Sequence, residues 1–395
     1  MRPEPLQKLA DSRGPCTRLR GARGFLSSQR QSPTVQPIEH SRISKILHVK
    51  MSRTLDPDTA ASLKSSNPET VYNDIVNALS TASDSLLEIE FLGKSHPLPP
   101  GCNVLVDGNS IAVTKVKLVQ AFVVARMIFF QYVRDCPKER SLDLENATAV
   151  MLLMDPEHLT AANARKRLIQ KTQREFKADL EELLRKELHF VDGYLTSRLH
   201  RHTKSPTLWG HRRWVLDVCK SIHMDYDIHH DLKSVILVAA ERHPRNYYAW
   251  SHLRWLVQLF NSCSSHSNTQ MTNVDFGKLV VVIKDWCLRH PADISGFSFL
   301  LFCLSMPGSS DDVQRTHLRS SIYSEVIRLA VSFKWTHETI WVFLRTLIAS
   351  GGISDDEKTA FFQAVGHIQK VQPDGHRFLE AAQDWCVKYT SEDES

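Results

Sequence analysis

Histidine and cysteine are the side chains of this sequence that could hold a metal or act as nucleophiles. The chain has nineteen histidines and eight cysteines, but it contains no His-Glu-x-x-His, no Cys-x-x-Cys and no regular Cys/His spacing of a metal site. It also lacks a Gly-x-Ser-x-Gly nucleophile motif and a glycine-rich phosphate loop. We interpret the histidine clusters at 200–202 and 229–230 as polar turns. The sequence therefore predicts no metal site in this chain.

Aromatic and basic residues recur in two matching blocks, KSPTLWGHRRWVLD (204–217) and RNYYAWSHLRWLVQ (245–258). Each block has a tryptophan, an arginine four positions later and a second tryptophan directly after it. Residues four apart share a face of a helix. We interpret the first Trp as filling the space against the preceding helix, and the Arg as covering an aromatic ring or pairing with an acid of a neighbouring repeat. These residues are Trp209, Arg213 and Trp214 in the first block, and Trp250, Arg254 and Trp255 in the second.

Weaker copies of the block extend the pattern in both directions, and the last copy also has Arg345 four residues after Trp341. The key positions of the five units are Asn163, Trp209, Trp250, Phe297 and Trp341, which lie 46, 41, 47 and 44 residues apart. A period near 45 residues is typical of two-helix repeats, in which no unit buries its apolar face without its neighbours. The sequence therefore predicts an all-α fold, a right-handed α-α superhelix of about five helix pairs.

Turns that contain proline come before the second helices of these pairs, as at Ser205-Pro206 and His243-Pro244. Helical periodicity predicts earlier helices at Thr114–Val133 and Gln173–Leu188, and one at Asp231–Glu241 with Asp231 as its N-cap. A short strand and turn are expected at 103–109, and no segment from 114 to 390 has a strand pattern. Further helices are predicted at Phe276–Leu288, Leu318–Ser332, Asp355–Lys370 and Phe378–Val387.

The first fifty residues differ from the rest of the chain in charge. They hold ten Lys/Arg and three Asp/Glu, a net +7, which leaves −2 for the remainder because the whole chain carries +5. We interpret 1–50 as a disordered basic leader, with organelle import as a minor alternative. Residues 51–110 are predicted to be an irregular N-terminal segment, and 111–390 to hold the repeats. The slightly acidic repeats argue against nucleic-acid binding, no run of 18 apolar residues spans a membrane, and the cysteine usage favours a cytoplasmic location.

The pattern Pro-x-Asn-Tyr-x-x-Trp-x-His-x-Arg-Trp resembles the repeat of protein prenyltransferase α subunits. PRNYYAWSHLRWLV (244–257) and KSPTLWGHRRWVL (204–216) carry this resemblance. The unit MLLMDPEHLTAANARKRLI, together with the strand at 104–106, is more similar to the repeat-containing proteins of that family. The resemblance implies a curved array of helix pairs around a β subunit, and that β subunit would hold the zinc and most of the isoprenoid.

The resemblance also implies roles for residues in the turns. Lys204 corresponds to a lysine that approaches the isoprenoid diphosphate, where an ammonium group stabilises the charge of the leaving group. Tyr247 and Tyr248 correspond to residues that face the same cavity. A solvated turn lysine is the alternative interpretation of Lys204. The sequence departs from the family pattern at Pro206, where the family usually has Tyr, and in the fourth unit, which lacks both Trp and Arg.

Two functional hypotheses follow from these residues. In the first, the chain is the α-type subunit of a heterodimeric protein prenyltransferase and is not catalytic alone. The pair would add a geranylgeranyl or farnesyl group to a C-terminal cysteine of a small GTPase or trafficking protein, and a Rab-type geranylgeranyltransferase β subunit is one such partner. In the second, the array is a non-enzymatic α-solenoid scaffold that binds another protein, which the two departures from the family pattern favour.

Overall fold

The computed structural model describes residues 67–80, 85–93, 95–175, 179–263, 276–305, 312–350, 353–372 and 376–390. All of them belong to one compact unit, Leu47–Ser395. The predicted basic leader at 1–50 lies outside the described residues, as does the segment from 51 to 66. Within the described ranges, none of the helices is both long enough and apolar enough to cross a bilayer.

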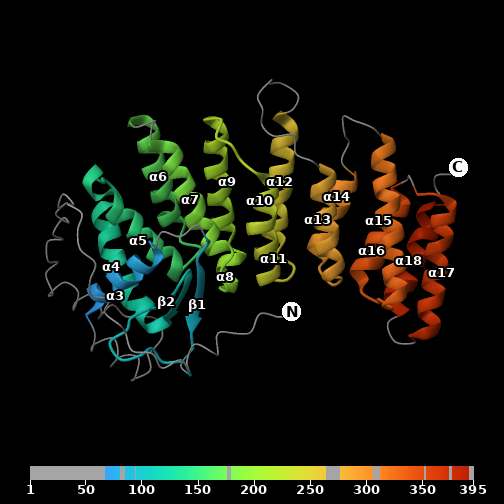
Figure 1. The fold of residues 1–395 in the computed structure, drawn as a ribbon, viewed down its shortest axis with the longest axis horizontal. Helices are drawn as coiled ribbons and strands as arrows, with labels where there is room; N and C mark the ends of the chain where they lie inside the picture. Colours follow the sequence, from blue (N-terminus) through green and yellow to red (C-terminus); the bar gives the residue numbers. More distant parts are fainter. Residues whose placement is uncertain are drawn as a thin grey trace, which may run out of the picture. The chain divides into compact units, whose positions relative to one another are not determined.

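The described part of the chain is a solenoid-like array of helices, which confirms the predicted all-α fold class (Figure 1). Helices α3 and α4 come first, and pairs of helices follow them. The short helices α8 and α10 and a π-helical segment, Leu232–Ile236, interrupt the array of pairs. The helices are α3 (Pro68–Leu79), α4 (Lys115–Tyr132), α5 (Ser141–Met154), α6 (Leu159–Glu175), α7 (Leu180–Leu195), α8 (His200–Thr203), α9 (Pro206–Ser221), α10 (Ile228–Asp231), α11 (Leu237–Arg242), α12 (Tyr247–Cys263), α13 (Phe276–Arg289), α14 (Ile294–Ser305), α15 (Asp312–Ser332), α16 (Glu338–Ala349), α17 (Asp355–Val371) and α18 (His376–Thr390).

A three-stranded sheet precedes α4. It consists of β1 (Glu88–Leu92), β2 (Leu105–Asp107) and β3 (Ser110–Thr114) in the order β1-β3-β2. β1 is parallel to β3 and β2 is antiparallel to it. The strand and turn expected at 103–109 are present as β2 and the turn at Gly108, whose φ of 57° favours glycine. The described part of 51–110, expected to be irregular, thus contains a helix and this sheet.

The helices from α5 onward pack as successive pairs, and the second helix of each pair also packs against the second helix of the next. This arrangement buries one continuous apolar core, in which each pair covers the apolar face of its neighbour. The pairs are α5 with α6, α7 with α9, the α10–α11 segment with α12, α13 with α14, α15 with α16, and α17 with α18.

The key position of each repeat is the fourth residue of its second helix. Trp209 and Trp250 have this place in α9 and α12, as do Phe297 in α14 and Trp341 in α16. In α6, which begins at Leu159, the equivalent residue is the buried Ala162. The prediction of Asn163 was therefore wrong by one residue, because the first unit has a small side chain where the later units have an aromatic one.

Two other local predictions were wrong. The helix expected at Gln173–Leu188 spans the turn between α6 and α7. The expected N-cap Asp231 is the last residue of α10, and the cap is instead Asp227, whose side chain accepts hydrogen bonds from the backbone N–H groups of His229 and His230 at 2.8 and 3.1 Å. Asp231 is buried and pairs with an arginine, so its carboxylate has a different role from the one its position suggested.

Candidate functional site

The first tryptophans of the blocks are core residues. Trp209, Trp250 and Trp341 are all buried. The indole Nε1 of Trp209 donates to the carbonyl oxygen of Thr203 at 2.9 Å, and that of Trp341 donates to the carbonyl of Trp335 at 2.9 Å. In both cases the acceptor lies six residues earlier, in the turn before the helix. This bond ties the turn to the helix that follows it.

The basic residue after each key position lies over an aromatic ring of the next repeat. The guanidinium of Arg213 is 5.7 Å from the ring centre of Trp255, and that of Arg254 is 4.3 Å from Phe302. Arg345 lies 5.1 Å from Trp385. In the first unit a lysine takes this position, and Lys166 lies 5.5 Å from Trp214. We call these contacts the cation–aromatic series; each links two consecutive second helices by about 0.5–1 kcal/mol.

The series has a gap at the fourth repeat. Leu301 stands at the position of the cation, and Thr346 stands at the position of the ring that it would cover. The loss of Trp and Arg from this repeat therefore removes one link between α14 and α16, whereas the burial of Phe297 keeps the core contact between them.

The turn residues assigned by the resemblance do not form one site. Lys204 is exposed at the end of α8, and it has no ion-pair partner among the described residues. Its neighbours are His200 and His243, whose Nδ1 atoms lie 3.4 Å apart. Burial, Lys204 and His200 together lower the pKa of His243. These three groups form a basic cluster at the α8–α9 turn.

Tyr247 and Tyr248 begin α12, and their rings are in edge-to-face contact at 5.7 Å. Both are exposed, Tyr247 by 68%. Tyr247 lines a pocket between α12 and α14, whereas neither Lys204 nor Tyr248 is among the residues that line it.

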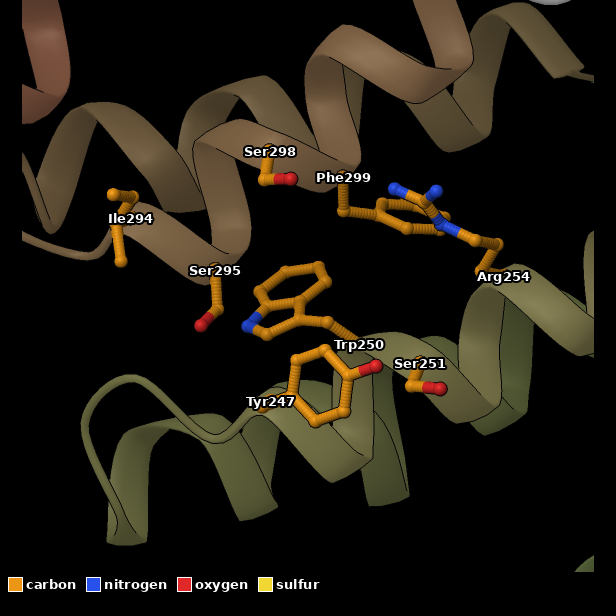
Figure 2. A pocket seen from close by; sticks show the side chains of 8 residues that line it. All are labelled: Tyr247, Trp250, Ser251, Arg254, Ile294, Ser295, Ser298 and Phe299. Atoms are coloured by element: carbon orange, nitrogen blue, oxygen red, sulfur yellow. The ribbon is translucent and has the colours of Figure 1, made fainter. Parts of the chain in front are cut away.

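The pocket has a cavity volume of about 370 Å³ (Figure 2), near the lower limit for ligand sites. Trp250 and Phe299 provide its apolar walls, and Arg254 is the charged residue among those lining it. The lining residues are Tyr247, Trp250, Ser251, Arg254, Ile294, Ser295, Ser298 and Phe299.

Trp250 differs from its equivalents in one respect that matters for this pocket. Only 3% of the residue is exposed, yet its Nε1 has no hydrogen-bond partner among the described residues. The preceding turn has a different backbone path here, because Arg245 adopts a positive φ of 61°. The carbonyl oxygen six residues before Trp250 belongs to Pro244, and the Trp250 Nε1 does not bond to it. A buried donor without a partner is destabilising, so this indole N–H is available to an acceptor.

Gly296 allows α14 to approach α12 closely at the pocket. A Cβ atom at this position would lie 2.7 Å from a ring carbon of Trp286 and 3.2 Å from one of Trp250. Trp250 and Trp286 are themselves in contact, with ring centres 5.1 Å apart. The fourth repeat thus keeps a small residue where the indole rings of Trp250 and Trp286 pack against α14.

We expect Gly296→Ala to lower the free energy of unfolding by about 1–3 kcal/mol, because the new methyl group overpacks this contact. Gly366→Ala in α17 is the matched control: a Cβ there meets no atom within 4 Å, and alanine should stabilise that helix by up to about 1 kcal/mol. Urea unfolding of both variants measures the difference. Equal effects of the same sign would contradict the packing role of Gly296.

Two buried ionic networks were not predicted. In one, Arg165 donates from Nε and Nη2 to both carboxylate oxygens of Glu187 at 2.7 and 2.6 Å, and Nε2 of His211 contacts Glu187 at 2.6 Å. Arg165 and His211 lower the pKa of Glu187 against the opposing effect of burial. This network joins α6, α7 and α9, so it holds the first two pairs in register.

The second network is centred on Arg212. Its guanidinium donates to both oxygens of Asp192, at 2.6 and 3.3 Å, and forms an ion pair with Asp231. It also contacts Nε2 of His252 at 2.7 Å. Burial and the nearby Arg212 and Arg213 hold the pKa of His252 well below its usual value, so the ring is neutral. The spacing in Trp209-x-x-Arg212 could have indicated that Arg212 shares the buried face of α9.

The described residues contain no group of three or more His, Cys, Asp or Glu side chains placed to hold a metal ion. The side chains that line the α12–α14 pocket are instead cationic, hydroxyl-bearing, aliphatic and aromatic.

Comparison with known families gives one result that bears on the sequence analysis. The model of the ECM9 middle domain matches residues 208–326, which run from α9 to α15 and make up a minority of the 395-residue chain. No curated protein matches the chain. The resemblance to prenyltransferase α subunits and to the repeat-containing proteins of that family is therefore wrong, since the matching model covers most of both blocks and is not of that family. The blocks have a packing role instead: tryptophans fill the core and arginines cover rings of the next repeat.

Proposed function

We propose that this chain is a non-catalytic helical-repeat subunit that binds a second protein along the turns before its second helices. The observation that supports this proposal is a row of exposed apolar residues at equivalent positions. The first residues of α6, α9, α12 and α14 are Leu159, Pro206, Tyr247 and Ile294, and all four are exposed. We call these four residues the turn row.

The turn row lies on helices that pack side by side, because α6 contacts α9, α9 contacts α12, and α12 contacts α14. Apolar side chains repeated at one edge of a helical array are typical of a protein-binding surface. Exposed cations are close to the row in sequence: Lys204 precedes Pro206, and Arg245 precedes Tyr247. Positive charge beside an apolar row favours a partner with an acidic contact surface.

The test is to purify the partner with the chain and then to substitute residues of the turn row. The tagged full chain is expressed in cells of its source and purified by affinity and size-exclusion chromatography, and a stoichiometric second protein is identified by mass spectrometry. We expect Tyr247→Asp combined with Ile294→Asp to weaken that complex by about 100-fold, since two apolar anchors of about 1.4 kcal/mol or more each are lost.

The control is Leu142→Asp, which changes an exposed apolar residue at the start of α5, a first helix, and so lies outside the turns before the second helices. This variant should bind the partner with unchanged affinity. A complex that survives the double substitution, or that Leu142→Asp weakens as much, would show that the turn row is not the binding surface.

The basic cluster at the α8–α9 turn favours a second candidate, in which the partner is a zinc-carrying isoprenoid transferase and this chain is its non-catalytic subunit. Lys204, His200 and His243 would then stabilise the negative charge of a departing diphosphate. The supporting observation is that these basic side chains gather at an exposed turn, where Lys204 has no ion-pair partner among the described residues.

This second candidate predicts that the purified pair transfers a geranylgeranyl or farnesyl group to a C-terminal cysteine of a small GTPase or trafficking protein. Lys204→Ala should then slow transfer at saturating isoprenoid without changing the affinity of the two subunits. A pair with bound zinc but no transfer, or a rate unchanged by Lys204→Ala, would leave the scaffold as the function.

A further inference from the structure

The α12–α14 pocket offers hydrogen-bond donors and a single positive charge. Among its eight described lining residues, Arg254 alone is charged, and four others carry hydroxyl groups. Ser251 already accepts a bond from Nη2 of Arg213 at 3.1 Å, so its own O–H is left to donate. Trp250 adds an indole N–H with no partner among the described residues. A pocket of this composition is complementary to an acceptor-rich, anionic group.

Arg254 is held in a position suited to such a group. Its guanidinium stacks on Phe302 at 4.3 Å, which supports one face of the group and leaves the N–H edges uncovered by that ring. Arg254 has no ion-pair partner among the described residues, in contrast to the buried Arg165 and Arg212. One guanidinium balances one negative charge, so a carboxylate matches this pocket better than a doubly charged phosphate.

The donors lie at two ends of the pocket. Figure 2 shows Arg254 beside Phe299 at one end, and the indole nitrogen of Trp250 turned toward Ser295 at the other. The apolar face of the Trp250 indole lies between these ends. An extended group with a carboxylate at one end, an apolar middle and a neutral acceptor at the other would meet all three features.

We propose that this pocket receives a short segment of the protein partner, with an acidic side chain bound to Arg254, an apolar side chain against Trp250, and a backbone carbonyl that accepts from the Trp250 N–H. The inference rests on the proposed function, because the segment belongs to that partner. Tyr247 and Ile294 belong both to the turn row and to the lining of the pocket, so a segment that lies along the row reaches the pocket directly.

The probe is the dipeptide N-acetyl-Leu-Glu-amide, titrated into the full chain labelled with ¹⁵N-tryptophan. The eight tryptophans give separate indole N–H signals, and Trp250→Phe identifies the one that matters. We expect the Trp250 signal to move while the Trp209 signal, whose N–H is already bonded to Thr203, stays in place. N-acetyl-Leu-Gln-amide should bind about tenfold more weakly, because it cannot form the charge-assisted bond.

Arg254→Gln should abolish the preference for the glutamate peptide. Arg345→Gln is the matched control, since Arg345 holds the same position in the fifth repeat, stacks on Trp385 and lies outside the pocket; it should keep the tenfold preference. A Trp250 signal that does not respond, or a preference that persists in Arg254→Gln, would overturn the inference. Equal binding of free 4-methylpentanoate would overturn the peptide segment as the ligand. Each of these results leaves the partner-binding test of the turn row unaffected, so the two proposals fail separately.

Discussion

Arg212→Ala is expected to lower the free energy of unfolding by about 3–5 kcal/mol, which is a large part of the stability of a typical domain. Arg212 is 1% exposed, and its guanidinium is the counter-charge of two buried carboxylates, Asp192 and Asp231. Its removal leaves both carboxylates in a site of low dielectric without a cation. Chemical denaturation followed by far-UV circular dichroism measures the change.

Two further variants test whether the loss of stability in Arg212→Ala comes from the unpaired carboxylates of Asp192 and Asp231. Arg213→Ala, one residue along, removes a half-exposed guanidinium that covers Trp255 and donates to Ser251, and should cost about 1 kcal/mol. Neutralising the carboxylates as well, in Arg212→Met with Asp192→Asn and Asp231→Asn, should recover part of the lost stability. If Arg212→Ala costs no more than Arg213→Ala, the network does not stabilise the fold.

The helical array was predictable because its signals are local. Proline turns, helical periodicity and the repeated Trp-x-x-x-Arg spacing are properties of single segments, and they predicted α13 and α17 within a residue or two of their observed ends. The strand at 105–107 was predictable for the same reason. What these signals could not give is the register of the first repeat, where Ala162 rather than Asn163 is the key residue, since a small side chain carries no periodic aromatic signal.

The partners of the buried charges were not predictable, because a charged residue in a helix gives no local sign of which residue will pair with it. Glu187 and Asp192 lie on α7 and are paired by arginines about twenty residues away in sequence. Asp231 looked like an N-cap by position, yet it is the partner of Arg212. Helix α5 was missed for a related reason: every residue from Ala147 to Leu153 is buried, so this half of the helix lacks the amphipathic pattern of a surface helix.

The donor in the α12–α14 pocket results from a structural difference between the two blocks that their sequences do not show. The two blocks align residue by residue, yet Trp209 has its hydrogen-bond acceptor and Trp250 does not. The two turns differ in backbone path: Arg245, before α12, adopts a positive φ of 61°, and no residue of the turn before α9 has a positive φ. Two blocks of nearly the same sequence therefore contain one indole N–H that is hydrogen-bonded, in Trp209, and one that has no partner among the described residues, in Trp250. The same similarity of the blocks suggested a family that the comparison with known families contradicts.

Lowering the pH from 6.5 to 4 is expected to destabilise the protein by about 3 kcal/mol through His202 alone. His202 is buried, and its Nε2 donates to the carbonyl oxygens of Leu152 and Leu153 at 3.1 and 3.0 Å, while burial lowers its pKa to about 4. An unfolded histidine titrates near 6.5. Between these two values the unfolded state binds more protons than the folded state, so the free energy of unfolding falls as the pH falls, and it levels off below about 4.

The neutral, buried His252 acts in the same direction, because burial and its neighbouring arginines hold its pKa well below 6.5. Urea unfolding at pH 7, 6 and 5 should therefore give a slope that approaches about 1.4 kcal/mol per pH unit for each of the two histidines below pH 6. Glu187 adds nothing in this range, since a carboxylate with a lowered pKa loses its contribution only below the unfolded value near 4.5. His202→Gln keeps a side-chain donor for the carbonyls and should remove the contribution of one histidine from the slope. His202→Gln with His252→Gln should remove a second contribution and leave that of His243, whose pKa is also lowered. A slope that is the same in the wild type and in both variants would show that these histidines bind protons equally in the folded and the unfolded states.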